Sequence, residues 1–158
     1  NVIANGGIYV APKLVRAVVG PDGTQTPAPD APSRRVVSEQ AANQTAAMMQ
    51  RVVCEGTATR AQVDNLPIAG KTGTAFKAAP NGTYYNEQGQ RIYYASFVGF
   101  FPADDPQVTV LVSVDEPPAG TNDRFGGTAA APVFAALVPT LIHELGIQPA
   151  PGSTGCQE

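Results

Sequence analysis

Five residues near the middle of the chain, Gly70-Lys-Thr-Gly-Thr74, combine one cation, two hydroxyl groups and two glycines. A lysine can hold an anion, and threonine hydroxyls can donate hydrogen bonds to the same anion. Glycine has no side chain, so a ligand can lie against the backbone there. This string is a candidate anion-binding site, and three interpretations of it compete.

The first interpretation is a phosphate-binding P-loop, whose pattern G-x-x-x-x-G-K-[ST] requires glycine at position 65. The chain has Asn65 there, and Gly73 follows the lysine where a helix would have to begin. Both observations argue against a P-loop. The second interpretation is a purely structural glycine- and threonine-rich strand with a solvated lysine, and the short string alone leaves it open.

The third interpretation is the K-T-G element of serine acyl-transfer enzymes that act on penicillin-like substrates. A strand edge can pair with an extended peptide or with the amide arm of a β-lactam. Lysine would attract a substrate carboxylate, and the threonine hydroxyls would hydrogen-bond to it. A backbone amide of the same strand could stabilise a developing oxyanion.

The elements that must position this string follow from the apolar patterns around it. Ser38 is predicted to cap a helix that ends at Gly56. Alternation and turn residues predict three strands with antiparallel pairing, at 68–76, 93–101 and 108–114. Thr128–Leu145 is apolar almost all round, which predicts a helix buried on the sheet. Pro139 should kink it.

The two ends of the chain are rich in glycine and proline. Residues 2–7 are predicted to end a helix, with Gly6 or Gly7 as its left-handed cap. A strand at 14–19 should run into an Asp22-Gly23 turn, followed by a loop at 24–32. The tail at 148–158 is expected to be mobile.

Composition excludes several classes of protein. Hydrophobic residues make up 43% and charged residues 15% of the chain, which is unlike a disordered protein or a coiled coil. The net charge is −3 and there is no Lys/Arg run, which argues against nucleic-acid binding. The longest apolar run, at 129–142, is interrupted by Pro132 and Pro139 and is too short for a membrane span.

Other candidate residues favour plainer interpretations. His143-Glu144 lacks the second histidine of H-E-x-x-H, so a metal site is not expected, and no cofactor is implied. Cys54 and Cys156 are far apart and are expected to be free thiols, with a bridge as the alternative in an oxidising compartment. The tyrosines beside the polar loop at 77–90 are expected to pack beneath a hairpin, with substrate contact as the alternative: Tyr84, Tyr85, Tyr93 and Tyr94.

The order of short motifs decides between the interpretations. The chain resembles the C-terminal part of the transpeptidase domain of class B penicillin-binding proteins over about residues 2–147. The segments that carry this resemblance are Asn5-Gly-Gly7, Glu55-Gly-Thr-Ala58, Ala69-Gly-Lys-Thr-Gly-Thr-Ala75, Ala95-Ser-Phe-Val-Gly-Phe100, Pro102-Ala-Asp-Asp-Pro106, Asp115-Glu-Pro117 and Gly126-Gly-Thr-Ala-Ala-Ala-Pro-Val-Phe134.

The resemblance implies an α/β fold of the α+β type, in which helices flank an antiparallel sheet. Residues 1–147 would be the C-terminal part of the transpeptidase domain, and residues 148–158 a flexible tail. Lys71, Thr72 and Gly73 match the family's third motif. Lys71 would anchor the substrate carboxylate and polarise the site, the hydroxyls of Thr72 and Thr74 would contact that carboxylate, and the Thr74 amide would form half of the oxyanion hole.

The resemblance also implies a peptidoglycan D,D-transpeptidase that acts through an acyl-serine intermediate. Expected partners are a stem peptide ending in D-Ala-D-Ala, β-lactams, the upstream part of the same domain and cell-division proteins. The parent protein would be anchored in the cytoplasmic membrane with this domain outside it. The family's S-x-x-K and S-x-N motifs are absent from the chain, so we expect a fragment that is inactive alone.

Further departures from the family pattern are Phe76-Lys77, where a glutamine is common, and Pro139. Two other functions stay open: a related acyl-serine hydrolase, meaning a D,D-carboxypeptidase or β-lactamase, and a non-catalytic β-lactam sensor or scaffold.

Overall fold

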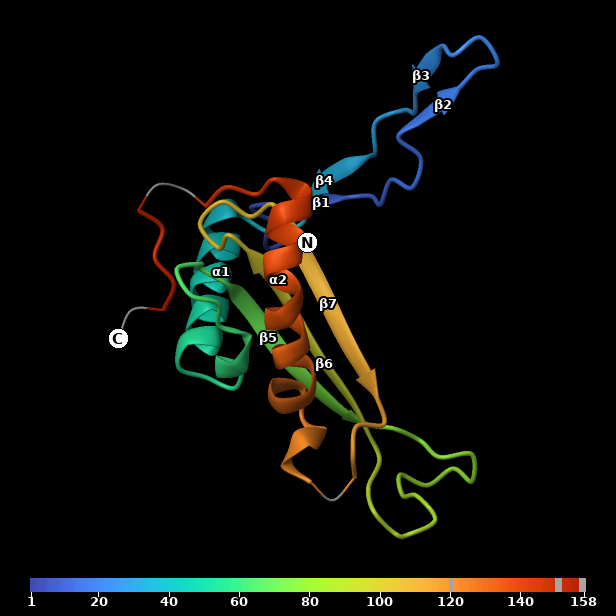
Figure 1. Ribbon diagram of the computed structural model, residues 1–158, viewed down its shortest axis with the longest axis vertical. Coiled ribbons are helices and arrows are strands. Elements are labelled where there is room, and N and C mark those ends of the chain that lie inside the picture. The colour runs from blue at the N-terminus through green and yellow to red at the C-terminus, as the bar shows by residue number, and fades with distance from the viewer. Residues whose placement is uncertain (120, 150–151, 157–158) are drawn as a thin grey trace. The chain divides into compact units, whose positions relative to one another are not determined.

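The computed structural model describes residues 1–119, 121–149 and 152–156 (Figure 1). It divides into two compact units, Asn1–Gln44 and Thr45–Glu158. The boundary falls within helix α1 (Glu39–Cys54). As predicted, the Ser38 hydroxyl caps this helix by accepting the Ala41 N–H at 3.1 Å.

The first unit contains two small antiparallel ribbons. Strand β1 (Ile8–Val10) pairs with β4 (Ser33–Arg35), and β2 (Ala17–Val19) pairs with β3 (Gln25–Pro27). The predicted turn is present, because Gly23 has φ +81° and the Asp22 carboxylate accepts the Thr24 amide at 3.0 Å. The prediction of a loop over residues 24–32 was wrong at β3, since the tight turn brings that segment back beside β2.

The glycines near the start of the chain adopt the predicted left-handed conformation. Gly6 and Gly7 have φ +59° and +92°, and the Gly7 N–H donates to Val2 O at 2.9 Å. Residues 2–7 nevertheless form a series of turns and not a helix. The left-handed conformation predicted for a glycine here is confirmed, whereas the helix that it was expected to cap is not found in these residues.

The second unit is built on a three-stranded antiparallel sheet with the order β5-β6-β7. The strands are β5 (Ala69–Phe76), β6 (Tyr93–Phe101) and β7 (Val108–Asp115), which agrees with the predicted positions and pairing. In the register, Lys71 lies opposite Val98, and Thr72 lies opposite Phe97. The candidate string therefore lies on a strand, as the third interpretation requires.

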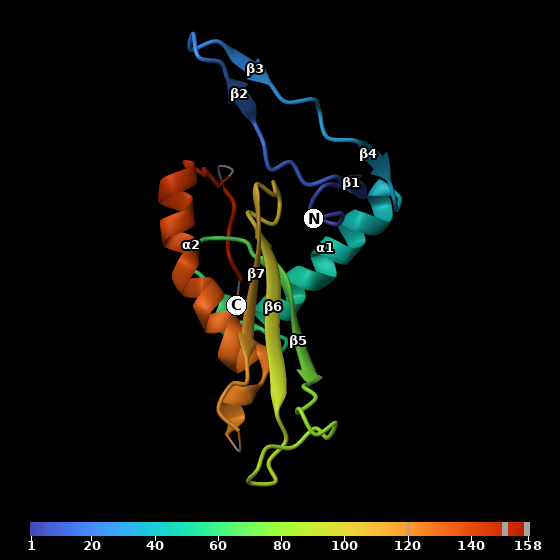
Figure 2. The same cartoon turned by 90° about the vertical axis from the view of Figure 1, so that its right-hand side faces the viewer.

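One face of this sheet forms the core with helix α2 (Ala131–Leu145) (Figure 2). Phe134 of α2 is fully buried, and its ring meets the Phe97 ring edge-on at 4.9 Å. Val138 lies one turn later and is also fully buried. The burial of large aliphatic and aromatic side chains such as these supplies most of the hydrophobic stabilisation of a small domain.

The burial predicted for α2 was only partly right. Val133 and Leu137 are 45% and 43% exposed, so one side of the helix faces away from the core. The segment Gly126–Leu145, which includes a π-helical turn at Gly126–Ala130, is long and apolar enough to span a membrane by length and composition alone. This corrects the expectation drawn from its prolines. Because Phe134 and Val138 pack against the sheet, the segment serves here as a core helix.

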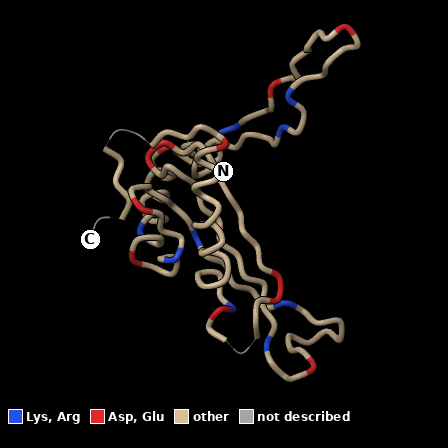
Figure 3. Tube along the Cα trace, in the orientation of Figure 1, with Lys and Arg blue, Asp and Glu red and all other residues tan. Residues whose placement is uncertain are grey.

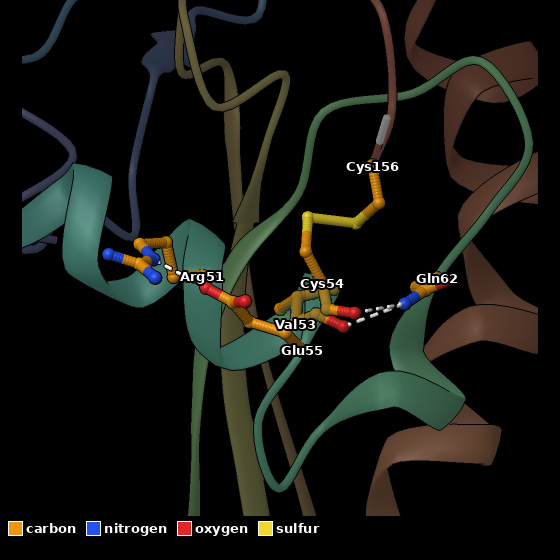
Figure 4. The surroundings of a disulfide bond; sticks show 6 residues. All are labelled: Arg51, Val53, Cys54, Glu55, Gln62 and Cys156. Atoms are coloured by element: carbon orange, nitrogen blue, oxygen red, sulfur yellow. Dashed lines mark hydrogen bonds and ion pairs between the residues drawn. A yellow bond between two sulfur atoms is a disulfide. The ribbon is translucent and has the colours of Figure 1, made fainter. Parts of the chain in front are cut away.

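A disulfide joins Cys54 at the end of α1 to Cys156 near the end of the chain (Figure 4). The expectation of free thiols was therefore wrong, because the fold brings together two residues separated by 102 positions. The bond also ties down part of the tail that was expected to be mobile. Residues 150–151 and 157–158 of that predicted tail lie outside the described residues.

Candidate functional site

The site is built on the outer edge of β5. Among the described residues, β5 pairs with β6 on one side only. The Lys77 N–H donates to Ile92 O at 3.0 Å, which continues the ladder beyond the strand. Because main-chain groups alternate in direction along an antiparallel pair, residues 71, 73 and 75 face β6, and the N–H and C=O groups of Thr72 and Thr74 face the open edge.

Lys71 lies on the face of the sheet opposite α2. Its cross-strand neighbour is Val98, whose own partner Leu111 is 65% exposed. The Lys71 ammonium nevertheless bends back to the strand edge and donates to Thr72 O at 2.9 Å. It also lies 3.4 Å from Thr72 Oγ1. The cation is thus exposed at the edge where an incoming chain would pair.

Thr72 connects this cation to a second hydroxyl. Its Oγ1 lies 2.8 Å from Thr57 Oγ1, and either hydroxyl can be the donor. Thr57 follows the end of α1, so α1 and β5 meet at this point. Lys71 Nζ, Thr72 Oγ1 and Thr57 Oγ1 form a short chain of donors in which each hydroxyl can reorient toward an anion.

Thr74 supports the fold through its hydroxyl oxygen and faces the open strand edge through its amide. Its Oγ1 accepts the Gly126 N–H at 3.1 Å, which fixes the turn before α2 against β5. Because the oxygen is the acceptor in this bond, the Thr74 hydroxyl proton stays available for another partner. The Thr74 amide faces the open edge by the alternation described above.

Two glycines allow the backbone to come this close. A Cβ at Gly126 would lie 2.2 Å from Ser96 O and 2.5 Å from Gly73 O. A Cβ at Gly127 would lie 2.0 Å from Thr57 O. No side chain fits at either position without displacing backbone. The Gly126-Gly127 pair therefore sets the distance between the α2 segment and the site strand.

The nearby cations differ in their partners. Lys77 forms ion pairs with Asp115 at 2.7 Å and with Glu116 at 2.9 Å. The hydrogen bond to Asp115, and then that to Glu116, raises the pKa of Lys77 above the ordinary lysine value. Lys71 forms no ion pair with any carboxylate among residues 1–119, 121–149 and 152–156. Of these two lysines, only Lys71 has its charge available to a ligand.

The four residues predicted from the sequence therefore lie on one strand, and the structure adds others. Thr57, Gly126 and Gly127 belong to segments quoted for the resemblance, but no role was assigned to them from the sequence. Their part depends on contacts between positions 15 to 70 residues apart in the chain, which no local pattern reports. Positively charged residues are scattered along the chain and form no continuous stretch (Figure 3).

The comparisons with known proteins now decide the family. Residues 1–138 match the penicillin-binding protein transpeptidase domain. This chain belongs to the transpeptidase family of penicillin-binding proteins. The match covers the Lys71 strand, the Gly126-Gly127 turn and most of α2, so the geometry described above is that of a penicillin-binding transpeptidase domain.

Relatives agree with this family. The chain is 37% identical over 147 residues to stage V sporulation protein D of Bacillus subtilis, covering 92% of the chain and 22% of the relative. It is 34% identical over 160 residues to penicillin-binding protein PbpB of Mycolicibacterium smegmatis, covering 95% and 24%. The chain therefore spans about a quarter of the length of these relatives.

A solved structure supports the fold. Penicillin-binding protein 3 of Mycobacterium tuberculosis, complexed with aztreonam, superposes with a TM-score of 0.78 at 31% identity. The match covers 99% of this chain and 36% of that chain. The predicted fold class, with helices and an antiparallel sheet of the penicillin-binding type, is thereby confirmed.

Proposed function

We propose that this chain supplies the strand with the K-T-G element that lines the active site of a peptidoglycan D,D-transpeptidase. The serine nucleophile would come from the upstream part of the same domain. The observation that carries the proposal is the unpaired Lys71 ammonium, which lies at an open strand edge beside the Thr72–Thr57 hydroxyl pair. Membership in the transpeptidase family supports it.

The carboxylate of the acyl donor would bind at this cation. Lys71 provides the charge, and Thr72 and Thr74 each retain a hydroxyl able to donate to it. The Gly73 position leaves the strand free of a side chain between the two threonines. The stem peptide ending in D-Ala-D-Ala would thus have its terminal carboxylate beside Lys71.

The scissile carbonyl would lie beside the Thr74 amide. That N–H faces the open edge, so it can act as one donor of an oxyanion hole. With the carboxylate at Lys71 and the carbonyl at Thr74, the acyl donor would pair with β5 by strand addition. A β-lactam places a carboxylate, a reactive carbonyl and an amide arm in the same order and would bind in the same way.

The disulfide supports a location outside the cytoplasm, because such bonds persist in oxidising compartments. We propose that the parent protein is anchored in the cytoplasmic membrane with this domain on the outer side. Cell-division proteins, which the resemblance implies as partners, are the further partners we propose.

The test is labelling of the full-length protein with a fluorescent penicillin, in the wild type and in a Lys71→Ala variant. We expect labelling of a serine in the wild type and a rate about a hundredfold lower in the variant, because a charge that positions the ligand has been removed. Lys77→Ala is the matched control, since its ammonium is already neutralised by Asp115 and Glu116.

The outcomes separate the alternatives. Undiminished labelling of the Lys71→Ala variant contradicts the role given to Lys71. A label that is rapidly released from the wild type indicates an acyl-serine hydrolase, because a transpeptidase lacks fast hydrolysis of its acyl-enzyme. No labelling of the wild type contradicts penicillin binding altogether.

A further inference from the structure

A second concentration of unpaired positive charge lies beyond the end of β5. A hollow of about 400 Å³ is lined by Gln90, Arg91, Tyr93 and Arg124. Arg91 lies just before β6, and Arg124 lies just before the Gly126 turn that contacts Thr74. The β5–β6 hairpin end and the turn before α2 lie at the same end of the sheet in both views (Figures 1 and 2).

The two guanidinium groups are held by a row of aromatic rings. Arg91 lies 4.7 Å from the centre of the Phe76 ring, and Arg124 lies 5.6 Å from the centre of the Tyr93 ring. Phe76 and Tyr93 are themselves in contact, with ring centres 5.4 Å apart. Stacking of this kind fixes the plane of a guanidinium and leaves its N–H groups directed outward in that plane.

Neither guanidinium is neutralised within the part of the chain that the structure describes. The ion pairs found there involve neither Arg91 nor Arg124. Arg91 uses Nε to bind the Tyr85 hydroxyl at 3.2 Å, and Arg124 uses Nη1 to bind Thr121 O. Arg124 Nε is buried and has no hydrogen-bond partner. Donors for an anion therefore remain on both side chains.

The direction of the bound peptide follows from the proposed function, on which this inference rests. If the terminal carboxylate lies at Lys71 and the scissile carbonyl at Thr74, the upstream part of the acyl donor must run on toward Phe76. A strand rises about 3.3 Å per residue. About one to two residues upstream of the scissile carbonyl, the acyl donor reaches Phe76 and the hollow beside it.

We propose that this hollow binds a carboxylate carried by the acyl donor one to two residues upstream of the scissile bond. The enzyme would then prefer acyl donors with an anionic group at that position over neutral ones. Two stacked guanidiniums suit a carboxylate, because each presents paired N–H donors that match its two oxygens.

The test uses two penicillins that differ by one group: benzylpenicillin and its derivative with a carboxylate on the α carbon of the side chain. That carboxylate occupies the place of a side chain one residue upstream of the reactive carbonyl. The second-order rate constant of acylation is measured for both with the full-length protein. Comparing the rate ratio between variants cancels the intrinsic reactivity of the two compounds.

We expect the ratio of the anionic to the neutral rate constant to fall about tenfold in an Arg91→Gln/Arg124→Gln double variant, because the paired donors are lost. Arg51→Gln removes the same charge from the exposed face of α1, where it pairs with Glu55, and should leave the ratio unchanged. An equal fall in this control would show a general charge effect and overturn the proposal, as would an unchanged ratio in the double variant.

Thermal melting of the double variant and acylation of the wild type serve as controls. If thermal melting shows that the double variant is not folded, the single variant Arg91→Gln provides the test, because Arg91 is exposed on the loop. Failure of both penicillins to acylate the wild type would contradict the proposed transpeptidase site itself. Acylation by both with a ratio insensitive to the arginines would contradict only the subsite.

Discussion

At the scale of single residues, the site depends on which lysine has no carboxylate partner among the described residues. Lys71 and Lys77 are six positions apart, but Lys77 is held by Asp115 and Glu116, whereas Lys71 bonds only to Thr72 among the contacts described. The same residue type therefore serves structure at one position and is available to a ligand at the other.

The glycine at position 126 is the residue whose substitution should have the clearest effect. In Gly126→Ala the new Cβ would overlap Ser96 O and Gly73 O, so the turn before α2 must move away from β5. We expect a loss of about 1–3 kcal/mol in the free energy of unfolding, measured by denaturant titration. Slower acylation by penicillin should accompany it, because Gly126 fixes Thr74.

Gly155→Ala is the matched control for that substitution. Its Cβ would meet Leu66 N and O at 3.4 Å, an ordinary contact, so a change within about 0.5 kcal/mol is expected. Equal stability of the two variants would show that the turn does not approach the sheet as closely as described.

At the scale of elements, the sheet separates the functions of its two faces and its edge. Residues on the face of Phe97 pack against α2, the opposite face carries Lys71, and the edge of β5 directs main-chain groups outward. The core face fixes the strand, so the edge keeps a constant position for an incoming peptide.

Substitutions in helix α2 should therefore lower the stability of the protein strongly on one side of the helix only. Phe134→Ala removes a fully buried ring between Phe97 and Phe101 and should cost about 3–5 kcal/mol of unfolding free energy. Leu137 is 43% exposed, so Leu137→Ala should cost about 1 kcal/mol or less of unfolding free energy. Thermal and denaturant unfolding of the two variants measures the difference, and similar losses would contradict the one-sided packing of α2.

At the scale of the whole molecule, the disulfide links two distant parts of the second unit. It closes a loop of about a hundred residues that contains the entire β5-β6-β7 sheet and α2. Cross-linking such a loop restricts the unfolded chain and stabilises the folded one through lost conformational entropy.

Reduction of this bond should lower the stability of the protein. The chain-entropy argument gives about 4–5 kcal/mol for a loop of this length, and measured values are often smaller. We expect a clear fall in melting temperature when a reductant is added. The Cys54→Ser/Cys156→Ser variant should melt at the lower temperature with or without reductant. If the wild type releases two thiols without any change in melting temperature, the bond has no stabilising role.

Patterns along the chain were enough to predict α1, the three strands of the sheet, α2 and the family, whereas the short strands β1, β3 and β4 were not predicted. The alternation of valines predicted β7, the Ser38 cap predicted the start of α1, and the ordered motifs identified a penicillin-binding transpeptidase. Local signals of this kind are strong because strand alternation, helix capping and glycine turns each depend on residues close together in the chain.

Other features became clear only from the way the elements pack in the folded chain. The Cys54–Cys156 bond, the Thr57–Thr72 hydroxyl pair and the row of rings beneath Arg91 and Arg124 join residues that no short pattern relates. Likewise, the exposed side of α2 could not be separated from its buried side by composition, because both are apolar. Contacts between distant residues depend on how elements pack, and packing is a property of the folded chain as a whole.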